Sequence, residues 1–151
     1  MDKAGMASDL NLESDVPRRP RVVLADDHPG MLEEIRLLLE DEFEVVGSAS
    51  EGQALLSLVA QLRPDAVVSD IHMPLVDGIE AGRRMLQEGL CSAVVILTVY
   101  NEPQLVGSAL ACGIRGYVLK EDAGEELALA VKTVAGGGAY LSSGIRGIRH
   151  S

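Results

Sequence analysis

Short apolar runs alternate with amphipathic stretches through most of the chain. Val, Leu, Ile and Ala dominate the runs, which is typical of strands buried on both faces of a sheet. In the stretches between them, apolar residues recur at helical spacing. The runs predict five strands, at residues 21–26, 44–49, 65–70, 93–98 and 116–119. The stretches predict five helices, at residues 29–39, 55–62, 77–88, 102–112 and 122–135.

Regular alternation of strands and helices indicates a doubly wound α/β fold. Each strand–helix–strand unit requires a right-handed crossover, which gives a parallel sheet with helices on both faces. In such sheets, ligands bind beyond the carboxyl ends of the strands. Polar or charged residues stand at or just past those ends, and we expect them to converge on one site: Asp26, Asp27, Asp70, Thr98 and Lys120.

The residue types at these strand ends suit phosphoryl chemistry. Three carboxylates close together repel one another, so they need a cation between them. Oxygen ligands with room for water favour Mg²⁺, which usually also bridges a phosphate. A lysine and a hydroxyl would complete a clamp around a phosphoryl group in transfer. Asp70, the carboxylate left accessible in the middle, could then act as the nucleophile and form an acyl phosphate.

Composition and charge narrow the class of protein. Hydrophobic residues make up 47% of the 151 residues, enough for one domain with a sizeable core. The net charge of -10 makes the chain a poor nucleic-acid binder. The sequence has no apolar run near the ~20 residues of a membrane helix and no signal-peptide pattern, so no membrane partner is expected. Cys91 and Cys112 lack nearby Cys or His partners in the sequence, which favours a reduced, cytoplasmic setting.

Short motifs surround the strand-end residues. Asp27-His28-Pro29 follows the first strand, Asp70-Ile71-His72-Met73-Pro74 follows the third, and Gly113 to Lys120 contains the fifth. With Thr98 after the fourth strand, they resemble the receiver domain of two-component response regulators over residues 21–138. The motifs are most similar to those of receivers that precede a LuxR-type helix-turn-helix.

The resemblance implies a phosphoacceptor and a metal site. Asp70 would accept the phosphoryl group from a histidine kinase, and Lys120 would pair with the phosphoryl oxygens. Asp27 and Asp70 would bind Mg²⁺ through their side chains, and Asp26 would hold it directly or through water. His72 would contribute its main-chain carbonyl to the metal.

The resemblance also implies a switch. Thr98 would hydrogen-bond to a phosphoryl oxygen, and Tyr117 would be the aromatic side chain that changes rotamer with it. Val99 is β-branched where the family usually has a small residue, so we expect it to crowd the approach of water. By resemblance, His72 and Tyr100 flank the same approach, and we expect a slowly decaying phosphorylated state.

Fold and function follow from the resemblance as expectations. The sheet would be flavodoxin-like, five-stranded and parallel, in the order 2-1-3-4-5. The protein would be a phosphorylation-controlled signalling switch of a two-component system, and not an enzyme beyond assisting its own phosphorylation and dephosphorylation. Its output would be transcription through a DNA-binding domain.

The chain divides into three parts in this interpretation. Residues 1–20 are polar and aperiodic and are expected to be a flexible leader, and residues 21–140 form the receiver. Residues 141–151 would begin a linker or tail, so DNA would be bound only through a C-terminal domain absent from this sequence. Both a truncated regulator and a single-domain receiver remain open.

Phosphorylation is expected to promote a homodimer. One possible face combines the helix at 102–112, the strand at 116–119 and the helix at 122–135. The other joins the first and last predicted helices, where Met31, Leu38 and Val131 would leave apolar surface.

Several alternatives compete with this interpretation. Asp26 and Asp27 could simply cap the following helix, Tyr117 could be an ordinary core aromatic, and the imidazoles of His28 or His72 could bind a transition metal. A haloacid-dehalogenase-like phosphatase would need Asp-x-Asp after the first strand, whereas this chain has adjacent Asp26-Asp27 there. A receiver used only for docking would need a broken site.

Overall fold

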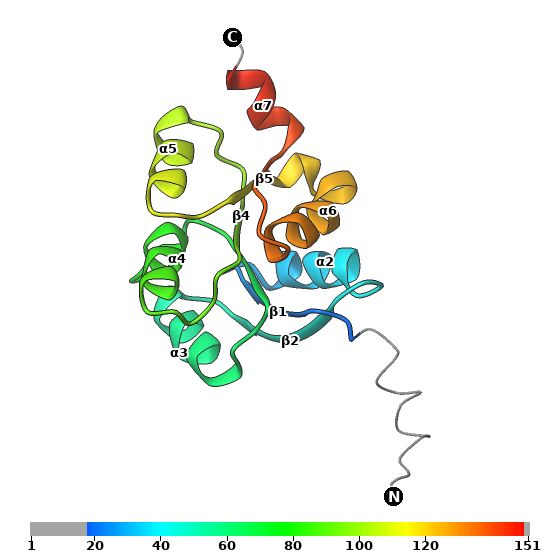
Figure 1. The fold of residues 1–151 in the computed structure, drawn as a ribbon, viewed down its shortest axis with the longest axis vertical. Helices are drawn as coiled ribbons and strands as arrows, with labels where there is room; N and C mark the ends of the chain where they lie inside the picture. Colours follow the sequence, from blue (N-terminus) through cyan, green and yellow to red (C-terminus); the bar gives the residue numbers. More distant parts are fainter. Residues whose placement is uncertain (1–17, 150–151) are drawn as a thin grey trace, which may run out of the picture.

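The apolar runs of the sequence form the strands of one parallel sheet (Figure 1). The protein is described here by a computed structural model covering residues 18–149, so the predicted leader lies outside the described residues except for residues 18–20. The strands are β1 (Arg21–Ala25), β2 (Glu44–Ala49), β3 (Ala66–Ser69), β4 (Val94–Thr98), β5 (Gly116–Leu119) and β6 (Tyr140–Leu141).

Five helices connect the strands at the positions that the sequence predicts, and a sixth, at residues 143–149, lies where the sequence predicted a linker or tail. They are α2 (Pro29–Leu39), α3 (Gly52–Leu62), α4 (Gly78–Gln87), α5 (Pro103–Ala111), α6 (Ala123–Ala135) and α7 (Ser143–Arg149), and a 3₁₀ turn, η1 (Lys120–Asp122), joins β5 to α6. Pro29 occupies the first turn of α2, where its missing N–H has no intrahelical partner to lose. The Asp77 side chain begins α4 by accepting a hydrogen bond from the Glu80 N–H (2.8 Å).

The strand order is β2-β1-β3-β4-β5-β6, and every pairing is parallel. The predicted order 2-1-3-4-5 is therefore confirmed, but the predicted number of strands is one too low. β6 pairs with β5 through the partners Gly116 with Tyr140 and Tyr117 with Leu141. It covers a strand edge whose N–H and C=O groups would otherwise be open.

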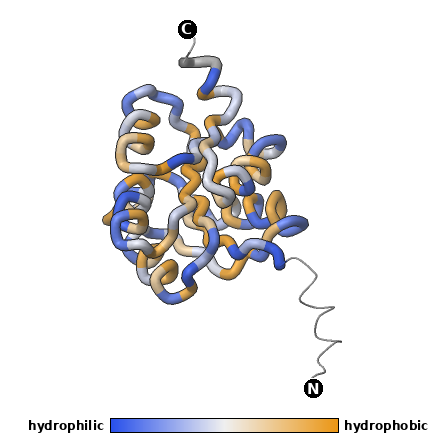
Figure 2. Tube along the Cα trace, in the orientation of Figure 1, coloured by the Kyte–Doolittle hydropathy of each residue, from blue (hydrophilic) through white to orange (hydrophobic). Residues whose placement is uncertain are grey.

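Two helical layers enclose the sheet. Helices α3, α4 and α5 pack on one face together with Ile145 of α7, and α2 and α6 pack on the other. The residues of β3, β4 and β5 are buried throughout, as expected for a sheet covered on both faces. Figure 2 shows hydrophobic colouring through the middle of the fold, where the sheet lies. Within the described part of the chain, no helix is long and apolar enough to span a membrane.

Candidate functional site

Four polar residues lie at the carboxyl edge of the sheet. Asp26 follows β1, Asp70 follows β3, Thr98 ends β4 and Lys120 follows β5. The Asp70 N–H donates to the Ala25 carbonyl (2.9 Å), so the ladder between β1 and β3 extends to the two carboxylates. Strand pairing therefore sets the relative positions of residues that lie far apart in the sequence.

Lys120 joins the two buried carboxylates. Its Nζ lies 2.9 Å from Asp26 Oδ2 and 3.3 Å from Asp70 Oδ2. The Asp26 and Asp70 side chains are 1% and 8% exposed, so little water screens these contacts. Burial alone would lower the pKa of Lys120, but the hydrogen bond to Asp26 and the charges of Asp70 and Asp26 outweigh it and raise that pKa. Lys120 is thus held as a cation against both carboxylates.

The surrounding backbone fixes the Asp70 carboxylate. The Ile71 N–H donates to Asp70 Oδ1 (2.7 Å), while Oδ2 faces Lys120. Gly78 lies against the Asp70 backbone, where an added Cβ would come within 1.9 Å of the Asp70 carbonyl oxygen. Only glycine permits this approach, so Gly78 allows the start of α4 to lie against the Asp70 backbone.

An acidic group beside Lys120 has the chemistry of a divalent-cation site. One ligand atom from each of Asp26, Asp27 and His28 lies within 4.8 Å of the other two. His28 Nδ1 lies 2.9 Å from Asp27 Oδ1 and 3.3 Å from Asp26 Oδ1. Asp26 and Asp70 contact Lys120, and Asp27 adds a third carboxylate next to Asp26. This excess of oxygen ligands and negative charge over one lysine fits Mg²⁺. His28 joins this group through its imidazole, which was considered only as an alternative ligand for a transition metal and not among the expected Mg²⁺ ligands.

Tyr100 connects the other predicted site residues. Its N–H donates to Thr98 Oγ1 (3.3 Å), its carbonyl accepts from the Tyr117 hydroxyl (2.7 Å), and its ring packs edge-on against His72 at 4.5 Å between centroids. Thr98 and Tyr117 are fully buried. Burial, followed by the negative charges of Glu102 and Asp70, raises the pKa of the Tyr117 hydroxyl, so it stays a hydrogen-bond donor.

This central position of Tyr100 was missed from sequence. From the sequence, Tyr100 was expected only to flank the approach to Asp70. Two of its three contacts use its backbone N–H and carbonyl, which every residue type other than proline has, so the residue type does not indicate them. The spacing of two residues from Thr98 was the only available indication. The structure places His72 on the exposed loop after β3, with its ring turned to Tyr100.

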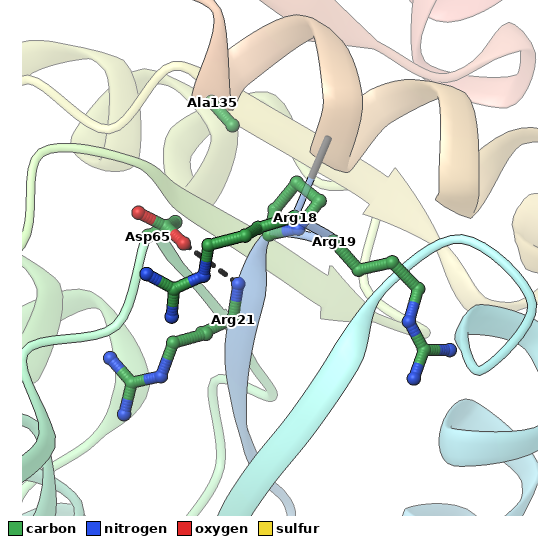
Figure 3. Close-up of a pocket in the computed structure, with 6 residues that line it drawn as sticks. Arg18, Arg19, Arg21, Asp65 and Ala135 are labelled. Carbon is green, nitrogen blue, oxygen red and sulfur yellow. Dashed lines mark hydrogen bonds between the residues drawn. The ribbon is translucent and has the colours of Figure 1, made fainter. Parts of the chain in front are cut away.

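A pocket lies at the opposite, amino end of the sheet. Arg18, Arg19, Pro20, Arg21, Asp65 and Ala135 line it (Figure 3). The Arg21 N–H donates to Asp65 Oδ2 (2.7 Å), and the Arg19 side chain points to the side opposite Arg18 and Arg21.

Two of the arginines around this pocket, Arg19 and Arg21, cap helices. Arg21 Nη1 donates to the carbonyls of Leu62 and Arg63 at the end of α3, and Arg19 Nη1 donates to the Glu40 carbonyl after α2. Such contacts satisfy the unpaired carbonyls at helix ends, where a cation is also favoured. We therefore assign these arginines a structural role.

The comparisons with known proteins concern the family and the fold. A family model described as the response regulator receiver domain matches residues 22–132. The transcriptional regulatory protein MctR of Rhizobium johnstonii is 38% identical over 127 residues, which cover 83% of this chain and 59% of MctR. The chain therefore spans less than two thirds of that relative's length.

Solved structures show the same fold. A two-component response regulator of the LuxR family from an Aurantimonas species superposes with a TM-score of 0.81 and 31% identity, over 86% of this chain and 94% of that one. The two-component response regulator RcsB in its complex with DNA gives a TM-score of 0.80 and 27% identity, over 88% of this chain and 68% of RcsB. The chain belongs to the response regulator receiver domains, and its relatives include transcriptional regulatory proteins.

Proposed function

We propose that Asp70 accepts a phosphoryl group from a histidine kinase and that the chain works as a phosphorylation-controlled switch. The observation that carries this proposal is the placement of Lys120 Nζ between Asp26 and Asp70 at the carboxyl edge of the sheet. Asp70 is the carboxylate on the central strand of this group, between the acidic residues after β1 and the hydroxyl at the end of β4.

The transfer step uses the groups already in place. A carboxylate oxygen of Asp70 forms the new O–P bond as the P–N bond to the kinase histidine breaks, and the imidazole nitrogen keeps the electron pair of that bond. Lys120 is positioned to neutralise the charge on the phosphoryl oxygens, and Ile71 N–H holds the nucleophile. Mg²⁺, when held by Asp26, Asp27, Asp70 and the His72 carbonyl, would supply further neutralising charge.

The same residues would assist the later hydrolysis, in which water attacks the phosphorus, the O–P bond to Asp70 breaks and inorganic phosphate leaves. The chain would thus act on itself and not on a separate substrate. While Asp70 is phosphorylated, the Thr98 hydroxyl would bind a phosphoryl oxygen and release the Tyr100 N–H, from which it accepts a hydrogen bond in this structure. Because Tyr117 bonds to the carbonyl of Tyr100, movement of Tyr100 would reach β5. We propose Thr98 and Tyr117 as the switch pair on this basis.

The output would be transcription. MctR is a transcriptional regulatory protein and RcsB was solved with DNA, so a DNA-binding domain beyond residues 141–151 would supply the contact with DNA. Residues 21–140 would form the receiver, and residues 1–20 a leader. The free thiols of Cys91 and Cys112 suit a reducing compartment, and we propose the cytoplasm.

A homodimer would form through α2 and α6. Leu37 and Leu38 of α2 and Leu129 of α6 are 57%, 38% and 53% exposed. The pocket between the two helices reaches Lys120, so this face adjoins the phosphorylation site. Val131, expected from sequence to add to this surface, is fully buried and does not. The other predicted face, formed by α5, β5 and α6, is the weaker candidate, because β6 covers the edge of β5.

Phosphorylation can be tested by mass. Acetyl phosphate with Mg²⁺ is expected to add one phosphoryl group, about 80 Da, to the wild-type chain. Asp70→Asn should add none, whereas Asp41→Asn, which changes an exposed carboxylate after α2, should behave as the wild type. An adduct on Asp70→Asn at the wild-type level would refute Asp70 as the phosphoacceptor.

A further inference from the structure

The segment after α6 folds back over β5. Residues 140–146, which we call the C-terminal strap, comprise β6 and the start of α7, and Figure 1 shows α7 next to β5. Ser142 is fully buried. Ile145 is 1% exposed and packs in the core cluster that contains Tyr117 and Leu119. A polar tail in the sequence is thus part of the folded core.

Hydrogen bonds join the strap to β5 along its whole length. The Tyr140 N–H donates to the Arg115 carbonyl (2.8 Å), and the Ser142 N–H donates to the Tyr117 carbonyl (3.0 Å). Further along β5, a side chain is the partner in place of the backbone, since Ser142 Oγ accepts from the buried Leu119 N–H (3.0 Å). Leu119 is the residue before Lys120, so this bond is the last one that the strap makes to β5 before the site.

The strap also holds the turn that begins at Lys120. The Gly144 N–H donates to Asp122 Oδ2 (3.0 Å), and the Ser143 N–H donates to the Glu126 carboxylate. A Cβ at Gly144 would come within 2.5 Å of Leu119 Cδ1, so the strap lies directly on the Leu119 side chain. Contacts on both sides of Lys120 therefore depend on the same short segment.

We propose that Ser142 is a positioning residue for Lys120, because its hydroxyl fixes the backbone from which the Lys120 side chain reaches the phosphoryl group. This inference rests on the proposed function of Asp70. A lysine side chain is flexible, so its effect on a phosphoryl oxygen depends on how firmly its backbone is held. Without Ser142 Oγ, the buried Leu119 N–H loses its acceptor, and a buried donor without a partner is costly enough for the backbone to shift.

The coupling must act in both directions. If the strap helps Lys120 bind the phosphoryl group, the phosphoryl group must stabilise the strap by the same factor. The strap would then tighten on phosphorylation, and any segment that follows it would be held more firmly against β5.

The test uses the full chain and beryllium fluoride with Mg²⁺, which mimics the phosphoryl group on a carboxylate. Calorimetric titration at a temperature where every variant is folded measures its dissociation constant. Ser142→Ala should weaken binding by about fivefold or more, the lower range of measured couplings. Ser142→Thr, which keeps the acceptor, should bind as the wild type. Tyr140→Phe removes a strap contact to Glu126 away from Lys120 and serves as the control.

Hydrogen exchange supplies the reciprocal measurement. Beryllium fluoride should slow exchange at the Leu119 and Gly144 amides of the wild type, and less so in Ser142→Ala. Equal affinity of Ser142→Ala and wild type, or equal weakening in all three variants, would overturn the positioning role while leaving Asp70 as phosphoacceptor. If the wild-type protein itself does not bind beryllium fluoride, both the inference and the proposed function fall.

Discussion

Replacing Lys120 with methionine removes the cation between Asp26 and Asp70 while keeping an unbranched side chain only one atom shorter. In the absence of Mg²⁺, the two carboxylates then face each other at 1% and 8% exposure with no ammonium between them. We expect Lys120→Met to be less stable than the wild type in chelator and to gain more stability than the wild type from Mg²⁺.

The structure sets the size of the effect. Removing one partner of a buried ion pair costs ~3–5 kcal/mol, and the 16% exposure of the Lys120 side chain places the expected loss near ~3 kcal/mol. For a domain of this size that loss lowers the melting temperature by about 10 °C. Without the lysine, three carboxylates remain for the metal, so Mg²⁺ should bind Lys120→Met at least about tenfold more tightly than the wild type. Saturating Mg²⁺ should then stabilise the variant by ~1.4 kcal/mol more than it stabilises the wild type.

Thermal unfolding in chelator and across a Mg²⁺ series measures both quantities. Lys132→Met is the matched control, because Lys132 pairs with Glu42 at the surface, where both side chains are about half exposed, and such a pair is worth ~0–1 kcal/mol. If Lys120→Met were no less stable than Lys132→Met in chelator, or if Mg²⁺ stabilised Lys120→Met no more than wild type, the reasoning would be wrong.

The pH dependence offers a further readout of the same contact. The pKa of Lys120 is raised in the folded state, so its contribution is fully present below pH 10.5, the ordinary lysine value, and is lost as the pH rises through the higher folded value. The stability difference between wild type and Lys120→Met should therefore shrink only above pH 10.5.

Two other predictions concern the phosphorylated state. Val99→Ala, alone and with His72→Asn, should speed the loss of phosphate by up to about tenfold, because lowering the steric barrier by ~1.4 kcal/mol is enough for that change. The measurement is the decay of radiolabelled phosphate on the protein. If the label decays no faster in either variant than in the wild type, Val99 does not shield the site. Leu37→Glu should abolish phosphorylation-linked dimers in analytical ultracentrifugation, while Leu110→Glu, at a 42% exposed position on α5, should not. The reverse result would assign the dimer to the other face, formed by α5, β5 and α6.

Much of the fold could be predicted from the sequence because its strands are buried on both sides. The run ending at Thr98 has no polar residue to break it, and the structure has a strand there, Val94–Thr98. The polar residues that follow each strand stand out against such runs. The contacts of Lys120 with Asp26 and Asp70 follow from parallel strands ending at one edge, as the sequence predicted.

Features that depend on backbone contacts between distant segments could not be predicted. β6 has only two residues, so it shows no periodicity, and its pairing depends on β5. Ser142 looked like any serine in a polar tail, because its burial comes from where the strap lies. Val131 was expected to leave apolar surface on a possible dimer face, but it is buried because α6 packs across the sheet with a wide apolar face.

The arginine caps at the amino end of the sheet give the molecule an electrical asymmetry. Arg19 and Arg21 place positive charge there, while Asp26, Asp27 and Asp70 collect at the other end of a chain with a net charge of -10. A small anionic phosphodonor must therefore approach Asp70 against the field of the protein, and added salt should speed that encounter by screening it. A partner that presents a basic surface around its phosphohistidine would instead be steered toward the site, with its approach oriented before contact.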